Sequence, residues 1–66
     1  MRVKFGRRIN LCKRVTHTPD SSLLLITTMY DGLYTVDCGS VKTAEVLFSQ
    51  VLINGYIDVS DFEYSN

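Results

Sequence analysis

The chain has 66 residues, of which 45% are hydrophobic and 21% are charged, and its formal net charge is zero. This composition excludes a disordered chain, and the length predicts one domain that spans residues 1–66. The longest aliphatic run covers only residues 23–26, which excludes a transmembrane helix. A core this small rarely supplies more than about 3–5 kcal/mol, and such domains often rely on a metal, a disulfide or an oligomer as well.

The charged residues are segregated along the chain. Residues 1–14 contain six basic side chains and no acid, which gives +6, whereas residues 15–66 contain one base and seven acids, which gives −6. The basic N-terminus is not followed by the apolar stretch of about 7–15 residues that a signal peptide needs. A signal peptide is therefore absent or already removed, and we expect a cytoplasmic protein.

Residues 2–15 alternate between apolar and polar side chains. Such a period of two predicts one half-buried strand. Gly6 marks a bulge or a bend within it. The apolar odd positions are Val3, Phe5, Ile9, Leu11 and Val15.

A β-hairpin is predicted next, from residues 23–30 and 33–38, which are rich in β-branched and aromatic side chains. The dipeptide Asp31-Gly32 separates them and is among the strongest hairpin signals. A two-residue loop places Tyr30 opposite Leu33. A three-residue loop would shift this pairing, and the sequence leaves that alternative open.

A helix is expected from Ser40, a good N-cap, to the Asn54-Gly55 stop signal. Residues 56–60 follow as a short strand, and the chain then changes phase in a bulge, a turn or a loose tail. The fold class is α+β, a β-β-β-α-β domain with a mostly antiparallel four-stranded sheet in the order 3-2-1-4 and one helix packed on one face. The fourth strand, parallel to the first, would place Asp58, Asp61 and Glu63 beside the basic first strand.

No motif for catalysis or metal binding is present. His17 lies in a predicted turn and is expected to be a surface histidine. Cys12 and Cys38 are expected to be reduced, buried or half-buried thiols, since they form no close pair of zinc ligands. We therefore predict no enzyme, no metal, no cofactor and no small-molecule substrate.

Two surfaces are candidate binding sites. One helix covers only one face of the sheet, and the two-residue loop leaves an apolar set on the other face. This predicted partner-binding set is Leu24, Ile26, Tyr30 and Leu33. A second surface consists of basic side chains able to contact phosphates, with Tyr30 as a stacking platform. This basic set is Arg2, Lys4, Arg8 and Arg14. Val46 and Ile53, on the polar side of the helix, are a weaker apolar candidate.

The Asp31-Gly32 turn, the helix after it and the Asn54-Gly55 stop together resemble the hairpin-then-helix core of some small anti-CRISPR proteins of phages. Those proteins bind and block bacterial defence nucleases. The resemblance covers about half of the chain, which lacks the acidic excess of the members that mimic DNA, and no functional residue carries over.

The resemblance implies a stoichiometric inhibitor from a phage or mobile element. With the uncovered sheet face, it predicts a non-enzymatic protein-binding module that forms a homodimer. The alternative is a nucleic-acid-binding protein that uses the basic N-terminal strand.

Overall fold

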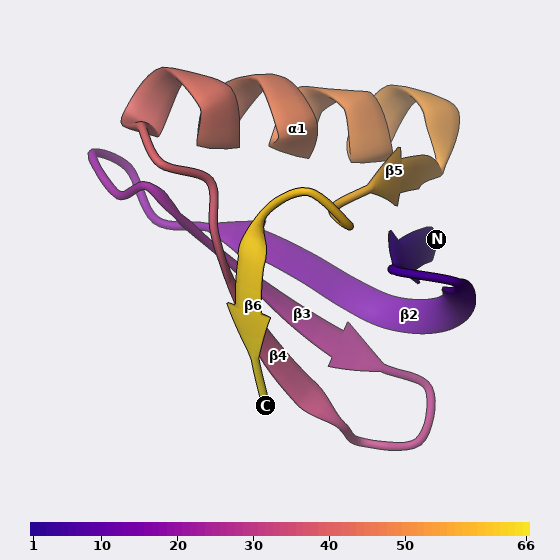
Figure 1. The fold of residues 1–66 in the computed structure, drawn as a ribbon. Helices are drawn as coiled ribbons and strands as arrows, with labels where there is room; N and C mark the ends of the chain where they lie inside the picture. Colours follow the sequence, from indigo (N-terminus) through magenta and orange to yellow (C-terminus); the bar gives the residue numbers. More distant parts are fainter.

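The computed structural model describes residues 1–66 as an α+β fold with one helix and a six-stranded mixed sheet (Figure 1). The sheet order is β5-β1-β2-β3-β4-β6, and every neighbouring pair is antiparallel except β1 and β5. The elements are β1 (Arg2–Phe5), β2 (Arg8–His17), β3 (Leu23–Thr28), β4 (Leu33–Asp37), α1 (Val41–Asn54), β5 (Tyr56–Asp58) and β6 (Glu63–Ser65).

The predicted α+β class is confirmed, but the sheet has six strands rather than four, because the predicted first strand is a hairpin and Glu63–Ser65 form a further strand. Phe5 lies opposite Arg8, so Gly6 and Arg7 form a two-residue loop. Gly6 has a φ of 61°, as a type II′ turn requires at its first position. The polar–apolar alternation continues through this turn while the two faces exchange. Ile9 and Leu11 therefore point outward, away from the buried side chains of β1.

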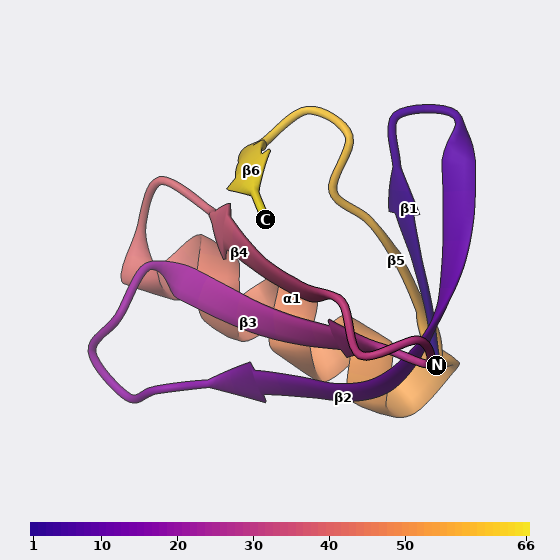
Figure 2. The same ribbon diagram turned by 90° about the horizontal axis from the view of Figure 1, so that it is seen from below.

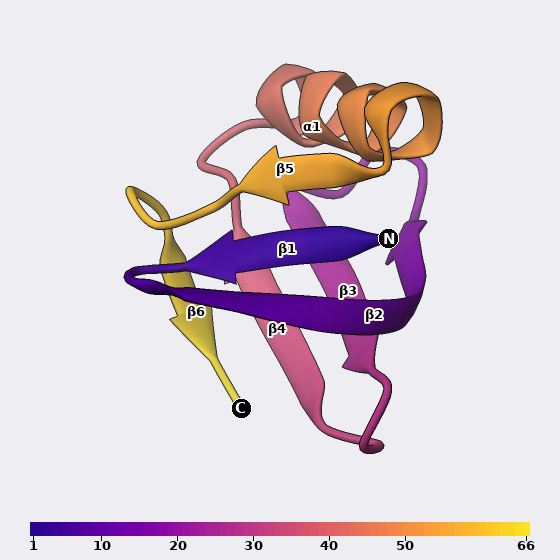
Figure 3. The same cartoon turned by 90° about the vertical axis from the view of Figure 1, so that its right-hand side faces the viewer.

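Strand β2 joins two half-sheets. Its first residues pair with β1, its last residues pair with β3, and a bulge lies between Cys12 and Arg14. Such a bulge bends a strand and increases its twist. As a result β1, β2 and β5 cross in front of β3 and β4 in Figure 3. We call β5-β1-β2 the first half-sheet and β2-β3-β4-β6 the second.

Helix α1 begins and ends where the sequence predicts. The Ser40 side chain accepts a hydrogen bond from the Thr43 N–H, and Gly55 ends the helix with a φ of 71°. Ala44, Leu47 and Val51 are its buried residues, whereas Leu52 is exposed. With 14 residues, α1 is neither long nor apolar enough to span a membrane.

The core lies between the two half-sheets and the helix. Its centre is apolar. Three aromatic rings from β1, β4 and β6 pack beside it: the centre of the Phe5 ring lies 4.6 Å from that of Tyr34 and 4.9 Å from that of Tyr64. The buried core residues are Val3, Phe5, Cys12, Val15, Leu24, Ile26, Val36, Cys38, Ala44, Leu47, Val51, Ile57 and Val59.

The two C-terminal strands lie at opposite edges of the sheet. Strand β5 runs parallel to β1, as predicted, and the Lys4 ammonium lies 3.9 Å from the Asp58 carboxylate. The expectation that Glu63 lies beside the basic first strand is wrong, because β6 pairs with β4 and Glu63 lies opposite Asp37. A turn closed by the Phe62 N–H and the Val59 carbonyl carries the chain between the two edges.

Candidate binding surface on the outer sheet face

The register of the β3–β4 hairpin decides which side chains reach the surface. Thr27 lies opposite Leu33, and the Thr28 N–H donates to the Gly32 carbonyl at 2.8 Å. The loop therefore contains three residues, 29–31, with Asp31 in the left-handed region at a φ of 65°. The two-residue loop is wrong, and the three-residue alternative is the one that forms.

Local contacts explain this loop. Asp tolerates the left-handed conformation better than most residues, and the Lys13 ammonium lies 2.6 Å from the Asp31 carboxylate. The hydrogen bond from Lys13 lowers the pKa of that carboxyl. Gly32 is needed for space rather than for a positive φ, because a Cβ there would lie 2.9 Å from the Thr28 Oγ1.

The observed register turns the opposite face of β3 outward relative to the predicted pairing, whereas β4 keeps the outward face that was predicted for Leu33. Leu24 and Ile26 lie opposite Val36 and Tyr34 and are completely buried. Their prediction as exposed partner-binding residues is therefore wrong, because the pairing shifts by an odd number of residues.

The other two predicted partner-binding residues do reach the surface, at different places. Tyr30 is 94% exposed in the loop between the strands rather than on a sheet face. Leu33 points outward as predicted. It is the one predicted residue that the observed register leaves on an exposed face of the sheet.

An apolar cluster nevertheless occupies the outer face of the second half-sheet, the face turned away from α1. Figure 2 shows β3 and β4 with α1 behind them. We call Leu23, Leu25 and Leu33 the leucine patch; they are 38%, 40% and 55% exposed. The polar residues that share this face are Arg14, Thr16, Thr27, Thr35, Asp37, Glu63 and Ser65.

A second exposed apolar group lies where β2 passes from one half-sheet to the other. Ile9 and Leu11 point outward from β2, and the Met29 N–H donates to the Leu11 carbonyl at 3.0 Å. The single-strand prediction missed this group by assigning Ile9 and Leu11 to the buried face. Gly6-Arg7 is the signal that could have revealed it, since Gly at the first loop position is typical of a type II′ hairpin.

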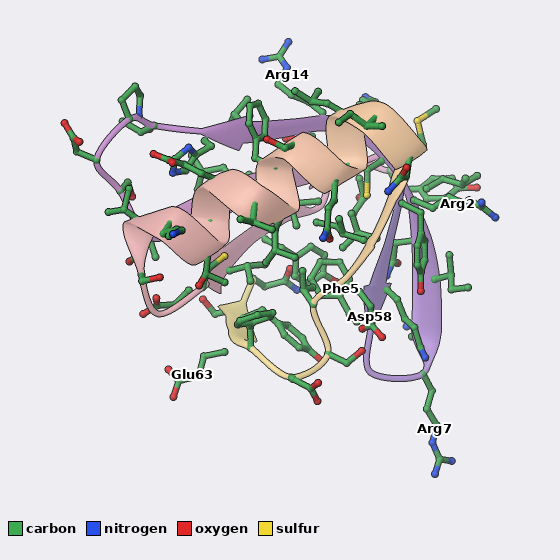
Figure 4. All side chains as sticks on the ribbon, turned by 90° about the horizontal axis from the view of Figure 1, so that it is seen from above. Arg2, Phe5, Arg7, Arg14, Asp58 and Glu63 are labelled. Carbon is green, nitrogen blue, oxygen red and sulfur yellow. The ribbon has the colours of Figure 1, made fainter.

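The predicted basic set does not form one continuous stripe. Lys4 pairs with Asp58, and the Arg2 guanidinium lies 5.8 Å from the centre of the Tyr56 ring. Arg8 begins β2 beside the hairpin turn, whereas Arg14 follows the bulge in the second half-sheet. In Figure 4 the side chains of Arg2, Arg7 and Arg14 extend in three different directions.

The prediction that His17, the sole histidine, lies in a turn at the surface is wrong. It is the last residue of β2 and is half-buried. The His17 Nε2–H donates to the Ser21 carbonyl at 2.6 Å, and the ring lies 6.0 Å from that of Phe48. No group of three or more His, Cys, Asp or Glu side chains in the chain is placed to hold a metal ion.

Both cysteines are free and buried. Cys12, in β2, lies beside the last residue of β3, and Cys38, which follows β4, lies beside the start of that strand. Cys12 pairs with Thr28, whereas the Cys38 N–H donates to the Ser22 carbonyl. Ser22 and Thr28 are six residue steps apart along an extended strand, or about 20 Å, far beyond the reach of a disulfide. Burial raises the pKa of each thiol, and the neighbouring Asp37 charge raises that of Cys38 further.

The outer side of α1 also carries exposed apolar residues. Val46 and Ile53 are exposed, as the helical spacing predicts, and polar side chains lie between and beside them. They line only a shallow depression together with Lys42, Glu45, Ser49, Gln50 and Asn54.

Comparison with protein-family models, with curated proteins and with solved structures finds no match to this chain. The resemblance to anti-CRISPR proteins therefore stays a prediction, and any functional assignment depends on the surface of the molecule.

Proposed function

We propose that the protein is a non-enzymatic protein-binding module that acts through the leucine patch. The observation that carries this proposal is the exposure of Leu23, Leu25 and Leu33 on two adjacent strands, on a face that α1 leaves uncovered. A contiguous exposed apolar group with a polar rim is the usual mark of an interaction surface. Here threonines border the patch, and charged residues lie at its corners.

The leucine patch suits a partner of moderate affinity. Covering the exposed part of each leucine contributes about 1 kcal/mol, since full burial of such a side chain contributes about 1.5–3 kcal/mol. The threonine hydroxyls and the corner charges then supply the directional contacts that set specificity. A stoichiometric inhibitor of the anti-CRISPR kind is one form that such a module takes, and its partner would be a bacterial defence nuclease.

We place this activity in the cytoplasm, where the free thiols of Cys12 and Cys38 stay reduced. A reducing compartment keeps such thiols free. Their burial also agrees with a packing role rather than a redox role.

Affinity capture from the cell that makes the protein tests the proposal. The wild-type chain should retain a specific partner or its own untagged copies, and Leu25→Glu should lose them, because it places a charge in the middle of the patch. Val46→Glu is the matched control, since it places the same charge at a similarly exposed site on α1. Equal capture by wild type and Leu25→Glu would overturn the proposal.

Nucleic-acid binding is the second candidate, and one observation favours it. The only ion pairs within the chain join Lys4 to Asp58 and Lys13 to Asp31, so Arg2, Arg8 and Arg14 have no acidic partner. Binding through them should weaken steeply with salt and on Arg8→Glu, and should be unaffected by Lys42→Glu on the helix. Absence of binding to single-stranded and duplex probes at low salt would exclude this candidate.

A further inference from the structure

We propose that the leucine patch binds a second copy of the same chain, in a twofold dimer whose two sheets cross at nearly a right angle. This assignment of the partner rests on the proposed function. It is carried by a second observation, the arrangement of charges around the patch.

The charges of the outer face lie at diagonally opposite corners. Arg14 lies opposite Thr27, and Thr27 lies opposite Leu33, so one row begins with a positive charge. In another row Glu63 lies opposite Asp37, and Asp37 lies opposite Leu23, so that row ends with two negative charges. Figure 4 shows Arg14 and Glu63 extending from opposite sides of the molecule.

These charges are free to pair with another chain. Arg14, Asp37 and Glu63 take part in neither of the two ion pairs within the chain. The Asp37 carboxylate already accepts hydrogen bonds from the Ser22 hydroxyl and the Gly39 N–H. Glu63 is therefore the acid better placed to meet an arginine of a second copy.

The strand register then selects the orientation of the two copies. Strands lie about 4.8 Å apart and alternate residues about 6.8 Å apart, so Arg14 and Glu63 are separated by about 14 Å across the strands and about 14 Å along them. If the twofold axis is parallel or perpendicular to the strands, Arg14 does not meet an acidic residue of the other copy. An axis at about 45° brings each Arg14 onto the other copy's Glu63, and the strands then cross at about 90°, which is a known form of sheet packing.

The same axis passes beside Leu25, which lies in the row midway between the two charged rows. Each Leu25 therefore packs near its symmetry mate at the centre of the interface, and the ion pairs lie at the rim. The outer face covers four strands by five residues, or about 19 Å by 17 Å. This area is small compared with the roughly 800 Å² that each partner buries in a standard interface. We expect a weak dimer, with a dissociation constant of about 10–100 µM.

Charge reversal with complementation tests this dimer by sedimentation equilibrium, from about 5 µM to about 1 mM. Arg14→Glu and Glu63→Arg should each weaken self-association by about tenfold or more, since each replaces two attractions by two repulsions. An equimolar mixture of the two variants should restore dimers to the wild-type level, because both pairs are then attractive again. Lys42→Glu on α1 is the control and should dimerise like wild type.

Restoration in the mixture also shows that both variants fold. A wild-type chain that stays monomeric up to about 1 mM, a dimer that ignores both reversals, or a mixture that fails to recover would each overturn the dimer. If the chain is monomeric and Leu25→Glu still abolishes capture of a different protein, the proposed binding surface stands and only the identity of the partner is wrong. If Leu25→Glu changes neither capture nor self-association, the proposed function itself fails.

Discussion

Thr28 lies directly opposite Gly32 at the end of the β3–β4 hairpin, where the Gly32 N–H donates to the Thr28 Oγ1 at 2.9 Å and the Thr28 N–H donates to the Gly32 carbonyl at 2.8 Å. This pair fixes a three-residue loop. Every outward-facing residue of β3 and β4 follows from it, including the three leucines of the patch.

Gly32→Ala should destabilise the protein by about 1–3 kcal/mol, because the new Cβ would lie 2.9 Å from the Thr28 Oγ1. Urea unfolding of the single and double variants measures the effect. In a Thr28→Ala background the same substitution should be less destabilising, since the close contact is gone. Equal losses in both backgrounds would show that the contact does not set the requirement for glycine.

Leu24 and Leu25 are adjacent in sequence and should respond in opposite ways to the same change. Leu24→Asp places a carboxylate in the core and should unfold the chain, because the loss exceeds the roughly 3–5 kcal/mol that a core of this size supplies. Leu25→Asp should stay folded and lose about 1 kcal/mol or less. Far-ultraviolet circular dichroism separates the outcomes. An unfolded Leu25→Asp variant together with a folded Leu24→Asp variant would contradict the observed register.

The two thiols should be slow to react in the folded protein and should not join to each other. Burial raises the pKa of Cys12 and Cys38, so little thiolate is present at neutral pH. Mass spectrometry after treatment with iodoacetamide should show modification that follows global unfolding in urea. Rapid modification of the folded chain, or an intramolecular disulfide after mild oxidation, would contradict the placement of these residues.

The stability of the fold should fall at acid pH partly through Asp58. Hydrogen bonds from the Ser60 hydroxyl and N–H, together with the nearby Lys4 charge, lower the pKa of this carboxyl. A lowered pKa in the folded state means that the unfolded chain binds the proton first. The stabilisation is therefore complete above the ordinary carboxyl pKa of about 4 and is lost as the pH falls through the lower folded value.

Titration of the Asp58 carboxyl by NMR checks the cause of this shift. Ser60→Ala should raise the Asp58 pKa toward its ordinary value, because it removes the main donor. Lys4→Met should raise it less, since the charge of Lys4 is the smaller contribution. A larger rise in Lys4→Met than in Ser60→Ala would show that the ion pair is the main cause instead.

The sequence was informative where a local signal has only one structural solution. Ser40 and Gly55 mark the two ends of the helix, because a side-chain acceptor is needed at its start and a residue that adopts the left-handed conformation is needed at its end. The parallel pairing of β5 with β1 also followed from the order of elements, since a helix connects two parallel strands of one sheet by a crossover.

The sequence was misleading where two local solutions compete. Asp31-Gly32 is compatible with both a two-residue and a three-residue loop. The hydrogen bond from the Gly32 N–H to the Thr28 side chain and the ion pair of Asp31 with the distant Lys13 favour the three-residue loop. Gly6 is compatible with a bulge or with a hairpin turn, because the alternation of side chains continues through both. Each choice exchanges the two faces of a strand, so the exposed residues were less predictable than the strands themselves.

The most direct test of the outer face as a binding surface is the concentration dependence of the backbone amide chemical shifts. Between about 10 µM and 1 mM, resonances of Leu23, Leu25, Leu33, Arg14 and Glu63 should move together along one binding curve, while those of Val46 and Ile53 on α1 stay fixed. Shifts centred on α1, or shifts absent from the outer face over this range and after addition of any captured partner, would contradict the account.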